Sequence, residues 1–583
     1  MKRKLILLLL LLTCWHVTLF AEKVYRPSTN GSPTSLDPVR SNTQYANLIV
    51  TSVFDTLYEY KYLKSPFELK PNLAVALPKV SPDGLTYTID IKKGVVFQDD
   101  AAFSGGKGRE VVASDVVYSF KRHFDKKNKS RGSWLWRGRI VGLDDWGKDG
   151  ADYQKEIEGL KAIGKYRLQI KLIKPFPQLT YTLAMGFVGV MAEEVVNKYG
   201  KEIGLHPVGS GPFVLTSFNT QKAVLVKNPN YRVDIMDLEG YVEEIHGKYG
   251  VKALAGKRLP IVDKVEFYFV KEAVARWNSL TKGDEIQLGS LLLEMENKVL
   301  ASKDPVTLLP EWAEKYHYIS ETEPGFVYNN FNMDNPEIGY NPDPKRNEAN
   351  RLLRCAIRKG FNWNERIKRF YRGLGKAFPG VVLRNTDGWD DSLSEDSIIY
   401  DPEEAKRLLA KGGWNKSNLP VLKYNTTSSA RMKQFFEQFR GWMKKIGYPT
   451  RKIKYVTYAT FGDFSKVLSE KKGMFWGIGW GLDYPDAENT LQLWYGPNES
   501  PGSNAANYKN KEYDRLYELS SVMQPSPERT RIYKRMNQIL INDCVNISGF
   551  SRTGISMWHK NVVQYYRANI IGSILKYVDV LEN

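Results

Sequence analysis

The chain has 583 residues and carries 84 Lys and Arg against 65 Asp and Glu, which gives a formal net charge of +19. Its 42% hydrophobic and 26% charged residues are typical of a globular protein and exclude a disordered or fibrous chain. The length predicts about four structural units, and the charge excess alone would suggest a nucleic acid or an anionic surface as partner.

The N-terminus has the pattern of a secretory signal. Residues 2–4 are basic, and residues 5–12 form an unbroken Leu/Ile run. We therefore expect residues 1–21 to be a signal peptide that is cleaved after Ala21. Leu19, at position −3 from the cleavage site, is bulkier than the small residue that the signal peptidase prefers there. Lipid attachment at Cys14 and an uncleaved anchor are less favoured alternatives. No later segment is apolar for long enough to cross a bilayer.

The N-terminal third of the mature chain alternates predicted strands with predicted helices, and the strand pattern recurs beyond it. Hydrophobic residues recur with period 2 over residues 86–91, 167–172 and 265–269, which predicts half-buried strands. Between the first two, Ser114 is the expected N-cap of a helix whose apolar stripe includes Val116, Phe120 and Phe124.

The second half is predicted to be more helical. Residues 348–358 and 432–446 carry apolar residues at helical spacing. Asp401 is the expected cap of a further helix that has Pro402 at its first position and ends at Gly412-Gly413. The sequence as a whole predicts a mixed α/β chain with insertions.

Motifs of catalysis and of metal binding are absent from the sequence. The six histidines are isolated, and neither a His-Glu-x-x-His nor a Gly-x-Ser-x-Gly motif occurs. The loop at 104–108 has Gly where a phosphate-binding loop needs Ser or Thr. Once Cys14 is removed, Cys355 and Cys544 allow at most one disulfide, and the sequence leaves open whether they pair. We predict no catalytic residue, no metal site and no cofactor.

Basic residues are concentrated in three stretches, at residues 121–139, 351–376 and 431–454. The first is interleaved with Trp134 and Trp136, a composition found in nucleic-acid grooves. Because export removes the protein from ordinary nucleic-acid partners, a solvated basic surface is the favoured interpretation.

Six separate stretches of sequence resemble the bacterial extracellular solute-binding proteins of family 5, the oligopeptide-, dipeptide- and nickel-binding proteins of ABC importers. Each match is weak alone, but their shared order spans nearly all of the mature chain. The sequence departs from the family pattern at an insertion over residues 234–258, in the longer loop at 107–110 and at Gln98-Asp99-Asp100. The matching stretches are Asp83–Ile89 with Lys92–Phe97, Val112–Arg122, Gly209–Phe213 with Lys227–Tyr231, Leu353–Ile357, Tyr400–Ala405 and Gly479–Asp486.

The resemblance implies an α/β, two-lobed periplasmic-binding-protein-like fold (type II, cluster C) with an extra small domain on lobe I. By analogy, lobe I takes residues 22–57, 159–323 and 549–583, the extra domain takes 58–158, and lobe II takes 324–548. The chain then crosses between the lobes near Glu323 and near Ser548, which are the predicted hinge.

The resemblance also implies a ligand-binding segment, Gly479-Trp480-Gly481-Leu482-Asp483. Asp483 would bind the amino terminus of a peptide, Trp480 would form a wall, and the backbone at Gly479 would pair with the peptide main chain. The alternative is that Asp483 only organises the following turn. Tyr455, Tyr458 and Phe461 are expected in the core rather than in the cleft.

The implied function is that of a non-enzymatic substrate-binding protein of an ABC importer, a periplasmic monomer that binds oligopeptides and delivers them to a permease in the inner membrane, with no nucleic-acid partner. Alternatives are an exported hydrolase acting on peptide or cell-wall material, or a receptor of the same fold for nickel chelate, haem, murein peptide or oligosaccharide. The basic stretches of lobe II predict a preference for acidic ligands and attraction to anionic membranes.

Overall fold

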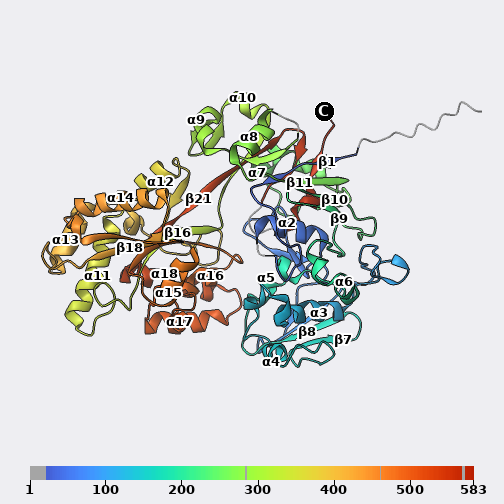
Figure 1. Cartoon of the computed structure of the whole chain (residues 1–583), viewed down its shortest axis with the longest axis horizontal. Helices are drawn as coiled ribbons and strands as arrows, with labels where there is room; N and C mark the ends of the chain where they lie inside the picture. The colour runs from blue at the N-terminus through green and yellow to red at the C-terminus, as the bar shows by residue number, and fades with distance from the viewer. Residues whose placement is uncertain (1–21, 42, 283–284, 460, 568–571, 583) are drawn as a thin grey trace, which may run out of the picture.

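The computed structural model describes residues 22–41, 43–282, 285–459, 461–567 and 572–582. The predicted signal peptide and the alternative lipid site at Cys14 lie outside the described residues. The chain forms two lobes that stand side by side and are joined by long strands (Figure 1). This mixed α/β, two-lobed arrangement is the predicted fold class.

The first lobe is built on a five-stranded sheet. Its strand order is β1 (Val24–Tyr25), β11 (Lys264–Phe269), β10 (Lys222–Lys227) and β9 (Phe213–Phe218), with β2 (Ser28–Thr29) also paired to β11. The predicted alternation in β11 is confirmed, because its Val265, Phe267 and Phe269 side chains are all buried. Helix α2 (Gln44–Val53) packs its apolar side chains against the same core.

A second sheet of four strands lies beside the first lobe and shares its hydrophobic core. The order is β5 (Lys79–Val80), β6 (Thr86–Asp90), β8 (Arg167–Lys171) and β7 (Leu160–Ile163), so the sheet includes strands from both sides of the predicted boundary at residues 158 and 159. The two strands predicted here, β6 and β8, are confirmed.

The helix predicted between these strands exists as α3 (Ala113–Phe124), but the expected cap is wrong. The helix begins one residue before Ser114, and the backbone N–H of Val112 donates to the Asp115 carboxylate at 2.9 Å. Adjacent Ser and Asp side chains can both accept from backbone N–H groups at a helix start, so the local sequence does not decide between them.

The second lobe contains a large mixed sheet. Its order is β12 (Leu288–Ser290), β21 (Asn546–His559), β16 (Gly325–Phe331), β20 (Phe475–Gly481), β18 (Leu422–Thr427) and β19 (Ile453–Tyr458). Buried clusters cover both faces of the strands β16 and β20. Helices α11 (Pro344–Lys359), α13 (Pro402–Lys411), α14 (Ala430–Lys445) and α18 (Pro527–Asp543) pack around it.

The helix signals of the second half are confirmed in detail. Asp401 caps α13 and accepts from the backbone N–H groups of Glu403 and Glu404 at 3.1 and 2.9 Å. The helix ends at Gly412, as predicted. In α14 the apolar stripe that contains Phe439 and Trp442 is buried.

One strand, β21, belongs to both lobes and crosses between them (Figure 1). Its first residues pair with β16, and its last residues pair with β15 (Tyr316–Thr322) and β12. A short strand, β17 (Gly375–Ala377), pairs with its middle. Beside this crossing, Glu323 forms an ion pair with Arg552 at 2.7 Å. The two lobes are therefore connected through continuous main-chain hydrogen bonding.

The first part of the basic stretch at 351–376 is structural, which corrects the prediction of a solvated basic surface there, while Lys368, Arg369, Arg372 and Lys376 are exposed as predicted. Arg351, Arg354 and Arg358 lie on α11 and donate to backbone carbonyls of residues 541–544, where α18 ends. Helix C-terminal carbonyls have no partner within their own helix, and they carry partial negative charge. Burial lowers the pKa of Arg354 to about 10. These charges therefore cap a helix and contribute little to a surface field.

The same contact contains a disulfide between Cys355 and Cys544. It joins α11 to the residue that follows α18, and its two cysteines are 189 residues apart in sequence. The pairing that the sequence left open is therefore present in the structure.

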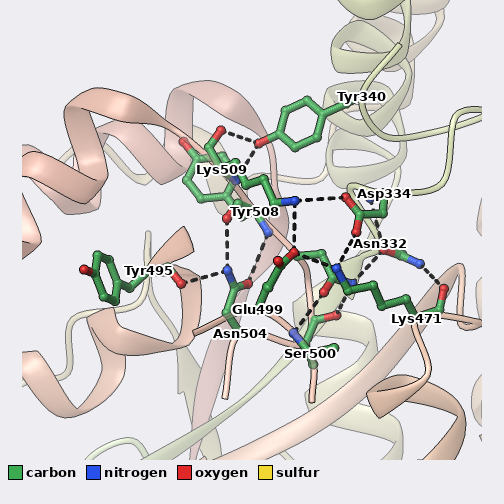
Figure 2. A network of polar contacts seen from close by, with 12 residues as sticks. Asn332, Asp334, Tyr340, Lys471, Tyr495, Glu499, Ser500, Asn504, Tyr508 and Lys509 are labelled. Atoms are coloured by element: carbon green, nitrogen blue, oxygen red, sulfur yellow. Dashed lines mark hydrogen bonds and ion pairs between the residues drawn. The ribbon is translucent and has the colours of Figure 1, made fainter. Parts of the chain in front are cut away.

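A polar network joins several loops of the second lobe (Figure 2). Lys471 and Lys509 both bind the carboxylates of Asp334 and Glu499, at distances from 2.6 to 3.8 Å. The pairs are partly exposed, and exposed ion pairs are worth only about 0–1 kcal/mol each. The network holds the loop around residue 499 against the end of β16 and suggests no chemistry.

Among the described residues, no helix combines the length and apolar character needed to cross a membrane.

Candidate functional site

The predicted ligand segment forms the end of β20 and the turn that follows it. One edge of β20 pairs with β16 along its whole length, and Gly479 lies opposite Val327. On the other edge, only Phe475 and Trp476 pair, with β18. In the part of the chain that the structure describes, no strand pairs with the remainder of this edge. Residues 477–481 therefore present free main-chain donors and acceptors.

Gly479 and Gly481 are exposed on this edge, while Trp480 is half-buried. The Trp480 ring packs against the cluster that contains Phe326 and Tyr328. Because the glycines have no side chain, another backbone can approach the edge closely.

Asp483 follows directly after β20 and is oriented by Asn489. The Asn489 amide nitrogen donates to the Asp483 carboxylate at 3.1 Å. The Asn489 amide oxygen accepts from the backbone N–H of Asp483 at 3.2 Å and from the Trp480 indole at 3.0 Å. One side chain therefore fixes both the predicted anchor and the predicted wall.

The Asp483 carboxylate is half-buried, and it forms no ion pair with any described residue. Burial raises its pKa above the ordinary value, and the hydrogen bond from Asn489 only partly offsets this effect. A desolvated acid of this kind gains most from a cationic partner, because its charged form lacks one in the free protein.

The residues just beyond Asp483 contact the first lobe. The Tyr484 ring stacks on Tyr181 with the centroids 6.3 Å apart, and the Gln178 amide donates to Asp486 at 3.4 Å. Asp486 is buried and forms an ion pair with buried Arg529 at 3.1 Å. Gln178 and Tyr181 lie just before and within the short helix α5 (Leu179–Thr182). The turn that holds the predicted anchor is thus also a contact between the lobes.

Two cavities adjoin this segment. One, of about 420 Å³, is lined by Gly479, Trp480 and Gly481 from β20 and by exposed Gln44 from the first lobe. The other, of about 300 Å³, is lined by Leu482 and Pro485 on the second lobe and by residues of the first lobe. Asp483 is not among the residues that line either cavity, although Leu482 before it and Pro485 two residues after it are.

Three arginines in these cavities were not predicted as site residues. Arg552 lines the first cavity, and Arg384 and Arg567 line the second. Arg384 is exposed and stacks on Trp389, with a weak ion pair of 3.6 Å to exposed Asp391. No local sequence signal distinguishes these three arginines from the other Lys and Arg residues of the chain, which number 84 in total.

Two of the three aromatic residues assigned to the core are partly packed, and the third is not. Tyr455 packs on Phe436, and the hydroxyl of Tyr458 accepts a hydrogen bond from the Asn425 amide. Phe461 is 63% exposed, so its assignment to the core is wrong. It lies at the first residue of α15 (Phe461–Ser469), and its ring contacts the buried Phe464 edge-on with the centroids 6.1 Å apart.

No group of three or more His, Cys, Asp or Glu side chains able to hold a metal occurs within the described ranges. The site offers main-chain hydrogen bonds, a desolvated carboxylate and aromatic walls, which are means of binding a ligand.

Comparison with known proteins gives the same family as the motifs. Residues 68–502 match the family described as bacterial extracellular solute-binding proteins, family 5 Middle. Haem-binding protein A of Haemophilus influenzae is 24% identical over 533 residues, which cover 88% of this chain and 84% of that protein. The dipeptide-binding protein of Escherichia coli is 24% identical over 529 residues, which cover 88% of this chain and 86% of that protein.

Solved structures share the fold over almost the whole chain. The periplasmic binding protein DppA from Helicobacter pylori, in complex with the peptide STSA, has a TM-score of 0.67 at 21% identity, covering 96% of this chain and 99% of that one. The unliganded open form of the murein tripeptide-binding protein MppA has a TM-score of 0.74 at 18% identity, and the match covers 97% of this chain and 98% of that one. The chain therefore belongs to family 5 of the bacterial extracellular solute-binding proteins, which are non-enzymatic substrate-binding components of ABC importers.

Proposed function

We propose that this protein is an exported receptor that binds peptides between its lobes, captures their free amino terminus at Asp483 and delivers them to a permease in the inner membrane. The observation that carries the proposal is the half-buried Asp483 carboxylate, which has no cationic partner among the described residues and lies at the end of a strand with an open edge.

The amino terminus suits this site because it is the one cation that every free peptide carries. Its bond to a carboxylate is charge-assisted and contributes about 1.5–3 kcal/mol net when well formed. The ammonium would also supply the opposite charge that the desolvated Asp483 lacks, and it would lower the raised pKa of that carboxyl.

The open edge of β20 supports binding of a peptide main chain. An extended peptide beside residues 477–481 would add a strand where β18 stops pairing. Hydrogen bonds of this kind do not depend on side chains, so one site can accept many sequences. The two adjoining cavities, of about 420 and 300 Å³, would then receive side chains.

Peptide is favoured over haem by the residues that line these two cavities. Neither described lining includes a His, Cys or Met, which are common axial ligands of haem iron. Arg384 and Arg567 in the second cavity provide cations that the carboxylate groups of a peptide can pair with.

The test is calorimetry on the purified mature protein with matched tripeptides that differ only in a free or N-acetylated amino terminus. We expect the free-amine form to bind at least about tenfold more tightly, since the acetyl group removes the charge. Equal affinity for the two forms would refute capture of the amine. Mass spectrometry of ligand that co-purifies with the native protein tests the ligand class directly.

A further inference from the structure

The basic stretch at 121–139 divides into a buried and an exposed part. Its first two cations are buried, since the Lys121 ammonium donates to two backbone carbonyls at 2.8 Å and Arg122 forms an ion pair with buried Asp37 at 2.8 Å. The rest, residues 126–139, forms the loop that follows α3, and we call it the basic loop. The basic loop lines neither cavity at the anchor, so peptide binding does not account for its charges.

The basic loop carries positive charge without counter-ions. It contains six Lys and Arg residues and no Asp or Glu, and five of the six are exposed. Among the described residues, none of these five cations has an ion-pair partner. The acidic residues on either side, Asp125 and Asp144, accept from the backbone N–H groups of Lys127 and Gly138. The exposed cations are Lys126, Lys127, Lys129, Arg131 and Arg137.

The basic loop also exposes a tryptophan. Trp134 is 45% exposed, whereas Leu135 and Trp136 after it are buried. An indole combines a large apolar body with one N–H donor, and it therefore suits the boundary between water and the apolar part of a membrane. Lys and Arg side chains extend their charged ends toward headgroups while their apolar stems cover the surface beneath. A tryptophan among cations thus combines the two side-chain types that contact an anionic membrane surface.

Buried contacts fix the backbone of the basic loop. One ring nitrogen of buried His123 lies 2.7 Å from the Ser130 hydroxyl, and the other lies 2.8 Å from a backbone carbonyl. The backbone N–H of Arg131 donates to the carbonyl of Val39 at 2.9 Å. The exposed side chains are therefore presented on an ordered support, and contact with a surface would cost the ordering of side chains alone.

We propose that the basic loop is a contact surface for membranes that contain anionic phospholipids. Headgroup phosphates would supply the negative charge that the cations lack, and the headgroup layer would accept the indole of Trp134. A specific protein interface takes about 20–30 residues on each side, which is more than this loop contributes, whereas a fluid headgroup layer adapts to a few side chains. The family acts with ABC importers, which lie in a membrane, so this contact would keep the protein near its transporter.

The second lobe provides the comparison, because the sequence predicted membrane attraction there. Its stretch at 431–454 also has exposed cations without ion-pair partners among the described residues, including Lys433, Lys444 and Lys454. The tryptophan of that stretch, Trp442, is buried and has no part in the surface. We therefore expect the basic loop to bind membranes more tightly than the second lobe does.

The test measures binding of the mature protein to vesicles by co-sedimentation at low ionic strength. Vesicles of equal parts phosphatidylglycerol and phosphatidylcholine are compared with vesicles of phosphatidylcholine alone. The wild type should bind only the anionic vesicles, and ~0.5 M salt should release it because the charges are screened. A cation at an anionic surface contributes about fivefold to binding, so Lys126→Gln/Lys127→Gln/Lys129→Gln should weaken it at least about tenfold. Trp134→Ser should lose part of the binding with every charge kept.

The matched control is Lys433→Gln/Lys444→Gln/Lys454→Gln, which removes the same three charges from the second lobe. It should bind the anionic vesicles within about threefold of the wild type. All substituted lysines are exposed, and unchanged thermal unfolding of both triple variants would show that the loss of binding is a loss of surface contact.

The outcomes decide between a membrane, a protein and net charge. A loss confined to the variants of the basic loop supports the proposal. Equal losses in the two triple variants, or no binding of the wild type to anionic vesicles, overturn it. Binding to soluble polyglutamate that depends on the basic loop, without binding to vesicles, would assign the surface to an acidic protein and would also overturn it. Peptide affinity does not enter these results, so the proposed function is tested separately.

Discussion

Replacing Asp483 with Asn tests the amine anchor with little change of shape. The substitution removes the charge, and the contact with the Asn489 side chain at 3.1 Å can be kept by a hydrogen bond between the two amides. If the carboxylate binds the peptide amine, the loss is that of one charge-assisted hydrogen bond, about 1.5–3 kcal/mol, or roughly 10- to 150-fold in affinity. The folded state should be as stable or more stable, because a desolvated carboxylate is removed.

Calorimetry should compare the wild type and Asp483→Asn with free-amine and N-acetylated forms of one peptide. The wild type should distinguish the two forms, and the variant should bind both weakly. Asp145→Asn is a suitable control, since Asp145 is exposed on α4 (Leu143–Lys148) and lines neither of the two cavities at the anchor. Wild-type affinity of a correctly folded Asp483→Asn protein for free-amine peptides would refute the anchor.

The same site predicts a pH dependence of binding. Because burial raises the pKa of Asp483, this carboxyl takes up a proton at higher pH than an ordinary aspartate. Affinity for free-amine peptides should therefore fall as pH decreases through that pKa, and binding in this range should release a proton because the ammonium lowers the pKa. Asp483→Asn should abolish both effects.

The remaining predictions concern stability and are measured by denaturant unfolding. The double variant Cys355→Ser/Cys544→Ser should lower the free energy of unfolding by about 2–5 kcal/mol. The stabilisation by a disulfide grows with the length of the loop that it closes, and these cysteines are 189 residues apart. A decrease of less than about 1 kcal/mol would contradict this. Arg529→Met should lower the free energy of unfolding by about 3–5 kcal/mol, because the buried Asp486 carboxylate then keeps its charge without this partner. Adding Asp486→Asn to the Arg529→Met protein should restore part of the lost stability. Burial raises the pKa of Glu321 to about 7. Between the ordinary pKa of a glutamate and this raised value, the folded state holds a proton that the unfolded state has lost, so the free energy of unfolding falls as pH rises. Glu321→Gln removes this effect and should raise the free energy of unfolding by about 1–2 kcal/mol at pH ~8, a value already reduced because Glu321 is partly exposed. At pH ~4 the substitution should have no effect.

The elements that could be predicted from sequence are those with short-range signals. Strand β6 and the capped start of α13 are determined by alternation and by the Asp401-Pro402 pair, which act over a few residues. The family could be identified because several such segments occur in a fixed order. The residue that caps α3 could not be predicted, because Ser114 and Asp115 are adjacent and both are common at the start of a helix.

Features that depend on distant partners could not be predicted. The basic residues on α11 were interpreted as surface charge, because nothing near Arg354 shows that it meets the end of α18 almost 190 residues later. The same distance left the pairing of Cys355 with Cys544 open. At the site, Asp483 was predicted, but the open edge of β20 exists only because β18 stops pairing at Trp476, a consequence of the sheet register.

In the proposed function, the position of Asp483 would connect ligand capture to the contact between the lobes. Asp483 and Tyr484 are adjacent, and the first is the proposed anchor while the second stacks on Tyr181 of the first lobe. Asp486, two residues further on, is held rigidly by Arg529 and reaches Gln178. Because the turn is fixed at Asn489 and Arg529, a ligand that holds Asp483 restrains the same backbone that forms the contact between the lobes. A ligand can shift the balance of lobe arrangements only by its preference for one of them. A peptide bound at Asp483 would supply that preference through this turn, whose next residues contact Tyr181 and Gln178 of the first lobe.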